Sequence, residues 1–239
     1  WDEAGIRPGI TSLEDIRKLY FPGSREVCTL LQENDHWKNT YTSVPYNIAV
    51  VTNGSSVFDF KSRGPIVAMP VIEAKAALLN KLSGVNGYPV LLDAFDIKTF
   101  VEGIRRVASG YSGIHLSNIS SAYCFDIMDV LEEELRIPVI HDDQQGNATV
   151  VIAALINAAR FCHFDVHSAK VGVIGLGVTG LGIARFIHAY TGNPVWGSTR
   201  SEISARRHEA DGGVIMPFEE IMSKADIVIA TTSKGQVIS

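Results

Sequence analysis

Short apolar runs alternate with longer amphipathic stretches from about residue 46 to the end of the chain. In the first part they predict strands at 46–51, 88–95, 112–116 and 137–140, and helices at 73–82, 97–109, 121–135 and 148–162. Asn53-Gly54 also predicts a tight turn, with a return strand at 55–60. Strands that alternate with helices are typical of a parallel sheet covered by helices, so the expected fold class is α/β.

Polar residues that can accept a hydrogen bond from a first helical turn precede three of these helices. Asp96, Ser120 or Ser121, and Asn147 are expected to be the N-cap residues of the second, third and fourth helix.

A polar segment at 164–168 marks a boundary, and we expect one domain at 1–165 and a second at 166–239. Beyond it, strands are expected at 171–175, 194–197, 213–216 and 226–230, and helices at 181–190, 201–209 and 218–224. Strand, glycine turn and helix in this order predict the first half of a Rossmann dinucleotide-binding domain. The pattern of a second half does not follow, so this domain is expected to be incomplete.

Three glycines follow the strand that begins at Val171. Gly175, Gly177 and Gly180 are in G-x-G-x-x-G register and open a helix, which is the context in which this motif binds a pyrophosphate. A glycine-rich turn that binds nothing is the alternative. The spacing favours a dinucleotide site.

The next strand indicates which dinucleotide is expected. An acidic residue at its end would bind the 2′-hydroxyl of NAD, but Ser198, Thr199 and Arg200 occupy that place. Hydroxyl groups and a guanidinium suit a 2′-phosphate, so NADP is favoured over NAD, with a solvated Arg200 as the alternative. Residues that are expected to contact the cofactor are Gly175, Gly177, Val178, Thr179, Gly180, Ser198, Thr199, Arg200, Thr231 and Thr232.

Composition narrows the class of protein. The 239 residues are 46% hydrophobic and 20% charged, with a net charge of -5, so neither nucleic acid nor a membrane is an expected partner. Three cysteines lie far apart and form no zinc or disulfide pattern, which favours the cytoplasm. No apolar run reaches the roughly 18–20 residues of a membrane span.

Three features of the first domain indicate chemistry. Asp142 and Asp143 directly follow an apolar run, and could serve a metal, a proton, a sugar hydroxyl or only a helix N-terminus. Lys75 lies among apolar neighbours, where a lysine can act as a base. Tyr20 precedes a Pro-Gly turn and could pass a proton.

These features, in this order, resemble the malic enzymes, chiefly the shorter bacterial type. The resemblance covers residues 12–239 and keeps its order throughout. Its matching stretches are LYFPGSREVC, YNIAVVTNGSSVF, GPIVAMPVIEAKAALLNKLSGV, YSGIHLSNISSAYCFDI, EELRIPVIHDDQQGNATVV and VGVIGLGVTG. It implies an N-terminal malic-enzyme-type α/β domain that holds a small acid substrate, followed by the Rossmann domain.

The resemblance also implies roles for single residues. Tyr20 falls on the general acid that protonates the enol carbon, and Lys75 on the general base that takes the substrate's hydroxyl proton. Asp143 falls on a carboxylate that binds Mg or Mn, and Asp142 on its companion in catalysis. The implied activity is NAD(P)-dependent oxidation of malate or a related 2-hydroxy acid, by a homo-oligomer.

The sequence departs from this family at two metal ligands. Ser117 and Asn118 occupy the positions of a Glu-Asp pair, and neutral oxygens bind a hard cation weakly. We therefore expect a family member diverged at the metal site, which oxidises its substrate with or without decarboxylation. The alternatives are a metal-independent dehydrogenase, reductase or proton-transfer enzyme on another small acid in specialised biosynthesis, and a non-catalytic nucleotide-binding homologue.

Overall fold

The computed structural model describes residues 10–58 and 64–232. The chain divides into two compact units, Trp1–Val139 and Ile140–Ser239. Each contains a four-stranded sheet, which confirms the expected α/β class. Within the described residues, no helix is long and apolar enough to span a membrane.

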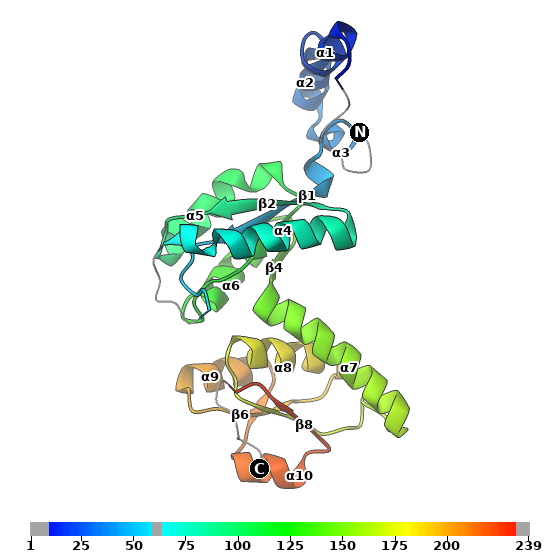
Figure 1. The fold of residues 1–239 in the computed structure, drawn as a ribbon. Coiled ribbons are helices and arrows are strands. Elements are labelled where there is room, and N and C mark those ends of the chain that lie inside the picture. Colours follow the sequence, from blue (N-terminus) through cyan, green and yellow to red (C-terminus); the bar gives the residue numbers. More distant parts are fainter. Residues whose placement is uncertain (1–9, 59–63, 233–239) are drawn as a thin grey trace. The chain divides into compact units, whose positions relative to one another are not determined.

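Three helices precede the first sheet and are drawn in blue in Figure 1: α1 (Leu13–Leu19), α2 (Gly23–Glu33) and α3 (Lys38–Tyr41). Short 3-10 turns η1 (Asp35–Trp37) and η2 (Val44–Tyr46) lie on either side of α3. A capping box starts α1, because Ser12 accepts from the Asp15 amide while the Asp15 carboxylate accepts from the Ser12 amide. Neither α1 nor α2 contains a buried residue.

The first sheet has the strand order β2-β1-β3-β4. Its strands are β1 (Asn47–Thr52), β2 (Asn86–Leu91), β3 (Gly113–Leu116) and β4 (Val139–His141), and β1 is parallel to both β2 and β3. The connecting helices are α4 (Met69–Ser83), preceded by the turn η3 (Pro65–Ala68), then α5 (Ile97–Val107), extended by η4 (Ala108–Gly110), and α6 (Cys124–Glu134). Right-handed crossovers place α4 on one face of the sheet and α5 and α6 on the other (Figure 1).

The hairpin expected at Asn53-Gly54 is wrong. The neighbours of β1 are β2 and β3, and residues 55–58 form no return strand, while 59 and 60 lie outside the described residues. The Asn53 side chain instead donates to the Ala94 carbonyl at 3.0 Å and accepts from the Ser55 amide at 3.1 Å. A turn residue thus ties the loop after β1 to the loop after β2.

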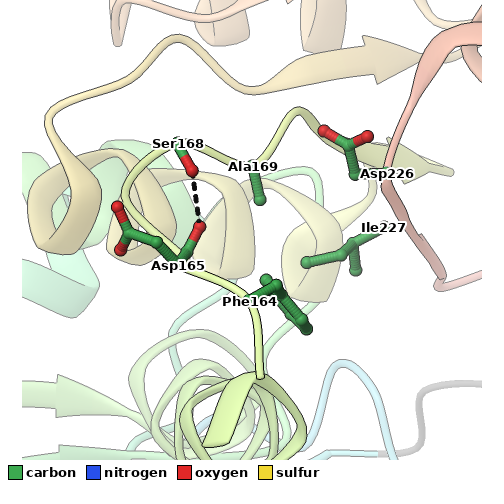
Figure 2. Close-up of a pocket in the computed structure, with 6 residues that line it drawn as sticks. All are labelled: Phe164, Asp165, Ser168, Ala169, Asp226 and Ile227. Carbon is green, nitrogen blue, oxygen red and sulfur yellow. Dashed lines mark hydrogen bonds between the residues drawn. The ribbon is translucent and has the colours of Figure 1, made fainter. Parts of the chain in front are cut away.

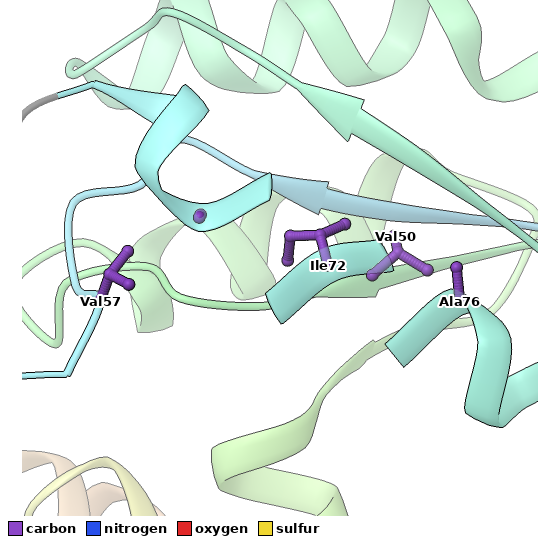
Figure 3. Close-up of a cluster of buried hydrophobic side chains, with 5 residues drawn as sticks. Val50, Val57, Ile72 and Ala76 are labelled. Carbon is purple, nitrogen blue, oxygen red and sulfur yellow. The ribbon is translucent and has the colours of Figure 1, made fainter. Parts of the chain in front are cut away.

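Helix α4 packs on β1 through small and branched apolar side chains. Val50, Val57, Ala68, Ile72 and Ala76 form this buried cluster (Figure 3). On β2, the Gly87 backbone is so close to α4 that an added Cβ would lie 2.5 Å from the Ala76 Cα. This close packing fixes the position of α4 against the sheet, and with it that of Lys75.

The second sheet has the order β7-β6-β5-β8 and is parallel throughout. Its strands are β5 (Val171–Ile174), β6 (Trp196–Ser198), β7 (Val214–Ile215) and β8 (Ile227–Ala230). Its helices are α8 (Val178–Thr191), α9 (Glu202–Ala210) and α10 (Phe218–Lys224). The same crossover rule places α8 and α9 on one face and α10 on the other (Figure 1).

The segment before β5 consists of a π-helical turn, η5 (Asp142–Gly146), which continues into α7 (Asn147–Cys162). In the second unit α7 packs against α8. The domain boundary expected between 165 and 166 falls after α7 and stays a prediction.

Of the three expected N-caps, one is confirmed. The Asp96 carboxylate accepts from the Thr99 amide at 2.9 Å. The prediction for Ser120 or Ser121 is wrong because α6 begins only at Cys124, after Tyr123. The prediction for Asn147 is wrong because η5 runs directly into α7, so Asn147 is already helical.

Candidate active site

Lys75 reaches from α4 to the carboxyl end of β3. Its Nζ lies 2.5 Å from Ser117 Oγ, and the Ser117 side chain is fully buried. The Ser117 amide donates to the Val51 carbonyl at 3.0 Å, which extends the β1–β3 pairing by one residue. The lysine is therefore held at the edge of the first sheet where parallel strands end, which is the usual place for a ligand in an α/β fold.

Asn118 continues this cluster into the neighbouring loop. Its Oδ1 accepts from the Ser117 hydroxyl at 3.0 Å, and its Nδ2 donates to the Ser56 carbonyl at 3.0 Å. The Ser56 amide donates to the Asn118 carbonyl at 3.1 Å. Asn118 has a φ of 54°, in the left-handed region that asparagine tolerates better than most residues.

A second link joins the same two loops. The Ser120 amide donates to Ser55 Oγ at 2.8 Å, and the Ser55 hydroxyl donates to Asn53 Oδ1 at 2.7 Å. Sequence reasoning missed this role of Ser55 and Ser120, since neither residue type nor spacing indicated that the two loops meet.

Tyr20 is the C-terminal cap of α1 and its side chain is 75% exposed. Its backbone carbonyl accepts from the Ser24 amide at 2.9 Å, which joins α1 to α2. Within the described residues its hydroxyl makes no hydrogen bond. The structure thus leaves the expected acid on an exposed surface and does not bring it to Lys75.

In the second unit, η5 gathers three potential ligands. Atoms of His141, Asp142 and Asp143 that could bind a metal all lie within 4.8 Å of one another. The Asp143 amide donates to both His141 Nδ1, at 3.2 Å, and Asp142 Oδ1, at 3.0 Å. His141 is fully buried and Asp143 is exposed. Sequence reasoning gave His141 no role, although its position beside the two aspartates was the available signal.

The donor sets in the two units differ in how well they suit a divalent cation. Hard cations favour several oxygens, carboxylates above all. Ser117 Oγ and Asn118 Oδ1 are neutral and already hydrogen-bonded to named partners, so this pair does not fit such a cation. Asp143 and Asp142 supply carboxylates, but only two.

The three glycines of the glycine loop differ in backbone conformation and in the space around them. Gly175 has a φ of 93°, and a Cβ at Gly180 would lie 2.0 Å from the Gly175 carbonyl oxygen. A Cβ at Gly177, in contrast, would meet no atom within 4 Å. Packing inside the protein explains Gly175 and Gly180, whereas the space over Gly177 is open at the N-terminus of α8, where a phosphate could approach the helix amides.

A cavity of about 610 Å³ adjoins this loop. Of the residues expected to bind a cofactor, Gly175, Gly177, Ser198, Thr199, Arg200, Thr231 and Thr232 line it. Ser201, Ser204 and Phe218 also line it and were missed, although Ser201 directly follows Arg200 and Ser204 lies on the next helical turn. The cavity is therefore lined by hydroxyl groups and a guanidinium as well as by the glycine loop.

A second cavity, of about 400 Å³, also includes Thr231 in its lining. Thr179, another expected residue, lines it together with Asn147, Val150, Ile183 and Ala230, among others. Val178 and Gly180 line neither cavity. Thr231, which follows β8 and donates to the Gly175 carbonyl, therefore borders both cavities.

The turn η5, which contains Asp142 and Asp143, packs directly against α8, the helix that follows the glycine loop. A Cβ at Gly182 of α8 would lie 2.9 Å from the Gln144 Cα, so the backbones of α8 and η5 are in direct contact. Asn147 Nδ2 is also 3.5 Å from Thr179 Oγ1. The second unit therefore holds Asp142 and Asp143 in a fixed relation to the nucleotide cavity.

A third cavity, of about 420 Å³, lies at the opposite ends of these strands. Phe164, Asp165, Ser168, Ala169, Asp226 and Ile227 line it (Figure 2). Its carboxylates already accept backbone hydrogen bonds, from the His167 amide to Asp165 and from the Lys170 amide to Asp226. It contains none of the expected site residues.

A parallel sheet with a glycine turn that opens a helix, and a nucleotide-sized cavity at the carboxyl ends of its strands, defines the second unit as a Rossmann-type dinucleotide-binding unit. Comparison with known proteins identifies the family.

The chain is 42% identical over 224 residues to NAD-dependent malic enzyme 1 of Bacillus subtilis. The aligned region covers 93% of this chain and 51% of that protein. It is 34% identical over 208 residues to the NAD-dependent malic enzyme of Geobacillus stearothermophilus, and this alignment covers 87% of this chain and 42% of that protein. Other relatives are named NADP-dependent malic enzymes. The chain thus spans about half the length of the curated relatives that it matches. No family model matches it.

The crystal structure of malic enzyme from Pyrococcus horikoshii superposes with a TM-score of 0.88 at 27% identity, over 96% of this chain and 58% of that chain. Sequence and structure agree, and the chain belongs to the malic enzyme family. Its fold follows from this membership.

Proposed function

We propose that this protein oxidises malate, or a closely related 2-hydroxy acid, with a nicotinamide dinucleotide. The main support for this proposal is the contact between α8 and η5, which holds Asp142 and Asp143 next to the helix that follows the glycine loop. A nucleotide site with acidic groups fixed beside it suits a reaction that moves a proton and a hydride together.

In this proposal Lys75 is the general base and Asp142 supports it. The amine of Lys75 takes the proton of the substrate hydroxyl, and the carbon–hydrogen bond breaks as the carbonyl forms. NAD(P)⁺, when bound, would supply the acceptor for the hydride. If loss of carbon dioxide follows the oxidation, Tyr20 is proposed to donate the proton to the enol carbon, which would require its exposed side chain to move to the substrate.

We propose NADP as the preferred cofactor, because Ser198, Thr199 and Arg200 line the cavity of about 610 Å³ and, among the residues that the structure describes, no carboxylate lines it. The relatives include both NAD- and NADP-dependent enzymes. Ser201 and Ser204 add two hydroxyl groups to the same wall, which strengthens the case for a 2′-phosphate.

Asp143 is proposed to be a weak ligand of Mg or Mn, with Asp142 and His141 beside it. Asp142 and Asp143 leave most coordination positions of such a cation to water or substrate, and Ser117 and Asn118 supply no further carboxylate. The metal site is therefore proposed to be diverged from that of the family.

A homo-oligomer is also proposed. Helices α1 and α2 bury no residue, and Leu13 and Phe21 are 76% and 61% exposed. An amphipathic pair of helices with an apolar face in water favours association with a second copy of the chain. A reducing compartment such as the cytoplasm suits the exposed free thiols of Cys28 and Cys162.

The test is spectroscopic formation of reduced nucleotide by the natural full-length protein, with malate, lactate and tartrate as substrates and NAD or NADP as cofactor. Turnover of malate is expected to exceed that of the other two acids. Tight nucleotide binding without turnover of any 2-hydroxy acid would contradict the proposal.

The matched variant is Arg200→Gln, with Arg206→Gln as control, since Arg206 lies on the exposed face of α9 and pairs with Glu202. Arg200→Gln is expected to raise the KM for NADP about tenfold or more while changing that for NAD little. An equal effect on both cofactors would show that NADP is not specifically recognised there.

A further inference from the structure

Four polar groups in the first unit are joined by three successive hydrogen bonds. This chain runs from the Ser56 carbonyl through the Asn118 amide and the Ser117 hydroxyl to Lys75 Nζ. The backbone of Asn118 is fixed by the Ser56 amide and that of Ser117 by the Val51 carbonyl. The chain is thus anchored in the loops that follow β1 and β3.

The direction of every bond in this chain follows from its first member. A backbone carbonyl can only accept, so the NH2 group of Asn118 must face Ser56, and its Oδ1 must face Ser117. The Ser117 hydroxyl then gives its single hydrogen to Asn118. Its oxygen offers only lone pairs to Lys75, and Nζ must be the donor in that bond.

This polarity suits a lysine in either of its charge states. An ammonium has three hydrogens and a neutral amine has two, so both can donate to Ser117 Oγ. In the neutral form the donated hydrogen directs the remaining lone pair away from Ser117. A divalent cation at the same oxygen would have to compete with this bond and would lie close to the lysine.

We propose that Ser117 and Asn118 are positioning residues for Lys75 and not metal ligands. They orient the amine for the substrate hydroxyl, so oxidation of the 2-hydroxy acid does not require a divalent cation at these two positions. This inference rests on the proposed function, and it adds a role for two residues whose chemistry the family resemblance leaves unexplained.

The first experiment separates orientation from structure. Ser117→Ala removes the acceptor for Nζ and is expected to lower kcat about tenfold or more, with little change in the KM for malate. Ser117→Thr keeps a hydroxyl and is expected to retain most of kcat. The control is Ser112→Ala at the other end of β3, which loses a hydrogen bond to the Asn47 carbonyl but is not part of the chain.

The second experiment measures the metal directly. Mn²⁺ affinity is determined by electron paramagnetic resonance for the unmodified protein, Ser117→Ala and Asn118→Ala. All three are expected to agree within about twofold, and malate oxidation is expected to persist in EDTA. A loss of Mn²⁺ affinity of about tenfold or more in either variant would overturn the inference, because it would show that the residue ligates the metal.

The two proposals fail in different ways. If the unmodified protein forms no reduced nucleotide from malate with or without Mn²⁺, the proposed function fails, and the Mn²⁺ titration still decides whether these residues ligate metal. If malate is oxidised but Ser117→Ala keeps the full kcat, the function stands and the positioning role is overturned.

Discussion

The glycines of the loop between β5 and α8 are needed for different physical reasons. At position 180 a side chain would overlap the Gly175 carbonyl oxygen, so only glycine fits there. At position 177 an added Cβ would contact none of the described residues. Gly177 also has a φ of -78°, a conformation open to any residue. Glycine is favoured at a helix N-cap, and the close approach of a ligand is a further physical reason for glycine at this position.

Alanine substitutions should separate these physical reasons. Gly177→Ala is expected to cost less than about 1 kcal/mol of folding free energy, yet to weaken nucleotide binding about tenfold or more. Gly180→Ala is expected to cost about 1–3 kcal/mol, because its Cβ would overlap backbone atoms. Thermal melting and nucleotide titration would check both. Unchanged nucleotide affinity in Gly177→Ala would contradict the proposed phosphate site.

At the scale of elements, α9 packs on β6 through a buried histidine. His208 Nε2 donates to the Val195 carbonyl at 2.8 Å, and the ring fills the space over Gly197 and Gly213. Burial lowers the pKa of His208 from its usual 6.5, although the Val195 carbonyl opposes this shift. The neutral imidazole therefore holds this part of the nucleotide unit together.

This histidine should make stability depend on pH. Below about pH 6.5 the unfolded chain binds a proton at His208 that the folded protein does not, so the free energy of unfolding should fall as pH decreases, by at most about 1.4 kcal/mol per unit. His208→Gln keeps a donor for Val195 and should reduce this slope. Denaturant unfolding between pH 7.5 and 5.5 would measure it, with the exposed His167→Gln as control. Equal slopes in the unmodified protein and His208→Gln would refute this role.

The sequence predicted the elements that depend on local pattern. Periodicity found the strands of both sheets, and the glycine motif correctly indicated a turn before α8, although α8 begins at Val178 and not at the expected residue 181. The predictions failed where a contact with a residue far away in the sequence determines the local structure. Asn53 forms no hairpin because its side chain binds Ala94, 41 residues away, and the role of Ser117 depends on Lys75, 42 residues away. No local signal in a single sequence reports such pairs.

At the scale of the whole molecule, the exposed apolar face of α1 predicts assembly. Replacing both Leu13 and Ile16 by Asp is expected to convert an oligomer into a monomer, because each would bring an unpaired charge to the interface. Sedimentation velocity would show the change. Ile203→Asp, at an equally exposed position on α9, is the control. A monomeric unmodified protein would contradict the proposed oligomer.

Lys75 is proposed to be the base for dinucleotide-dependent oxidation of a 2-hydroxy acid. The rate of NADPH or NADH formation from malate should be measured for the full-length protein and for Lys75→Ala, at matched nucleotide occupancy. Turnover is expected to fall by about 10²–10⁴ in the variant while nucleotide affinity is retained. Equal turnover in the two proteins, or no turnover in the unmodified protein with nucleotide bound, would contradict this proposal.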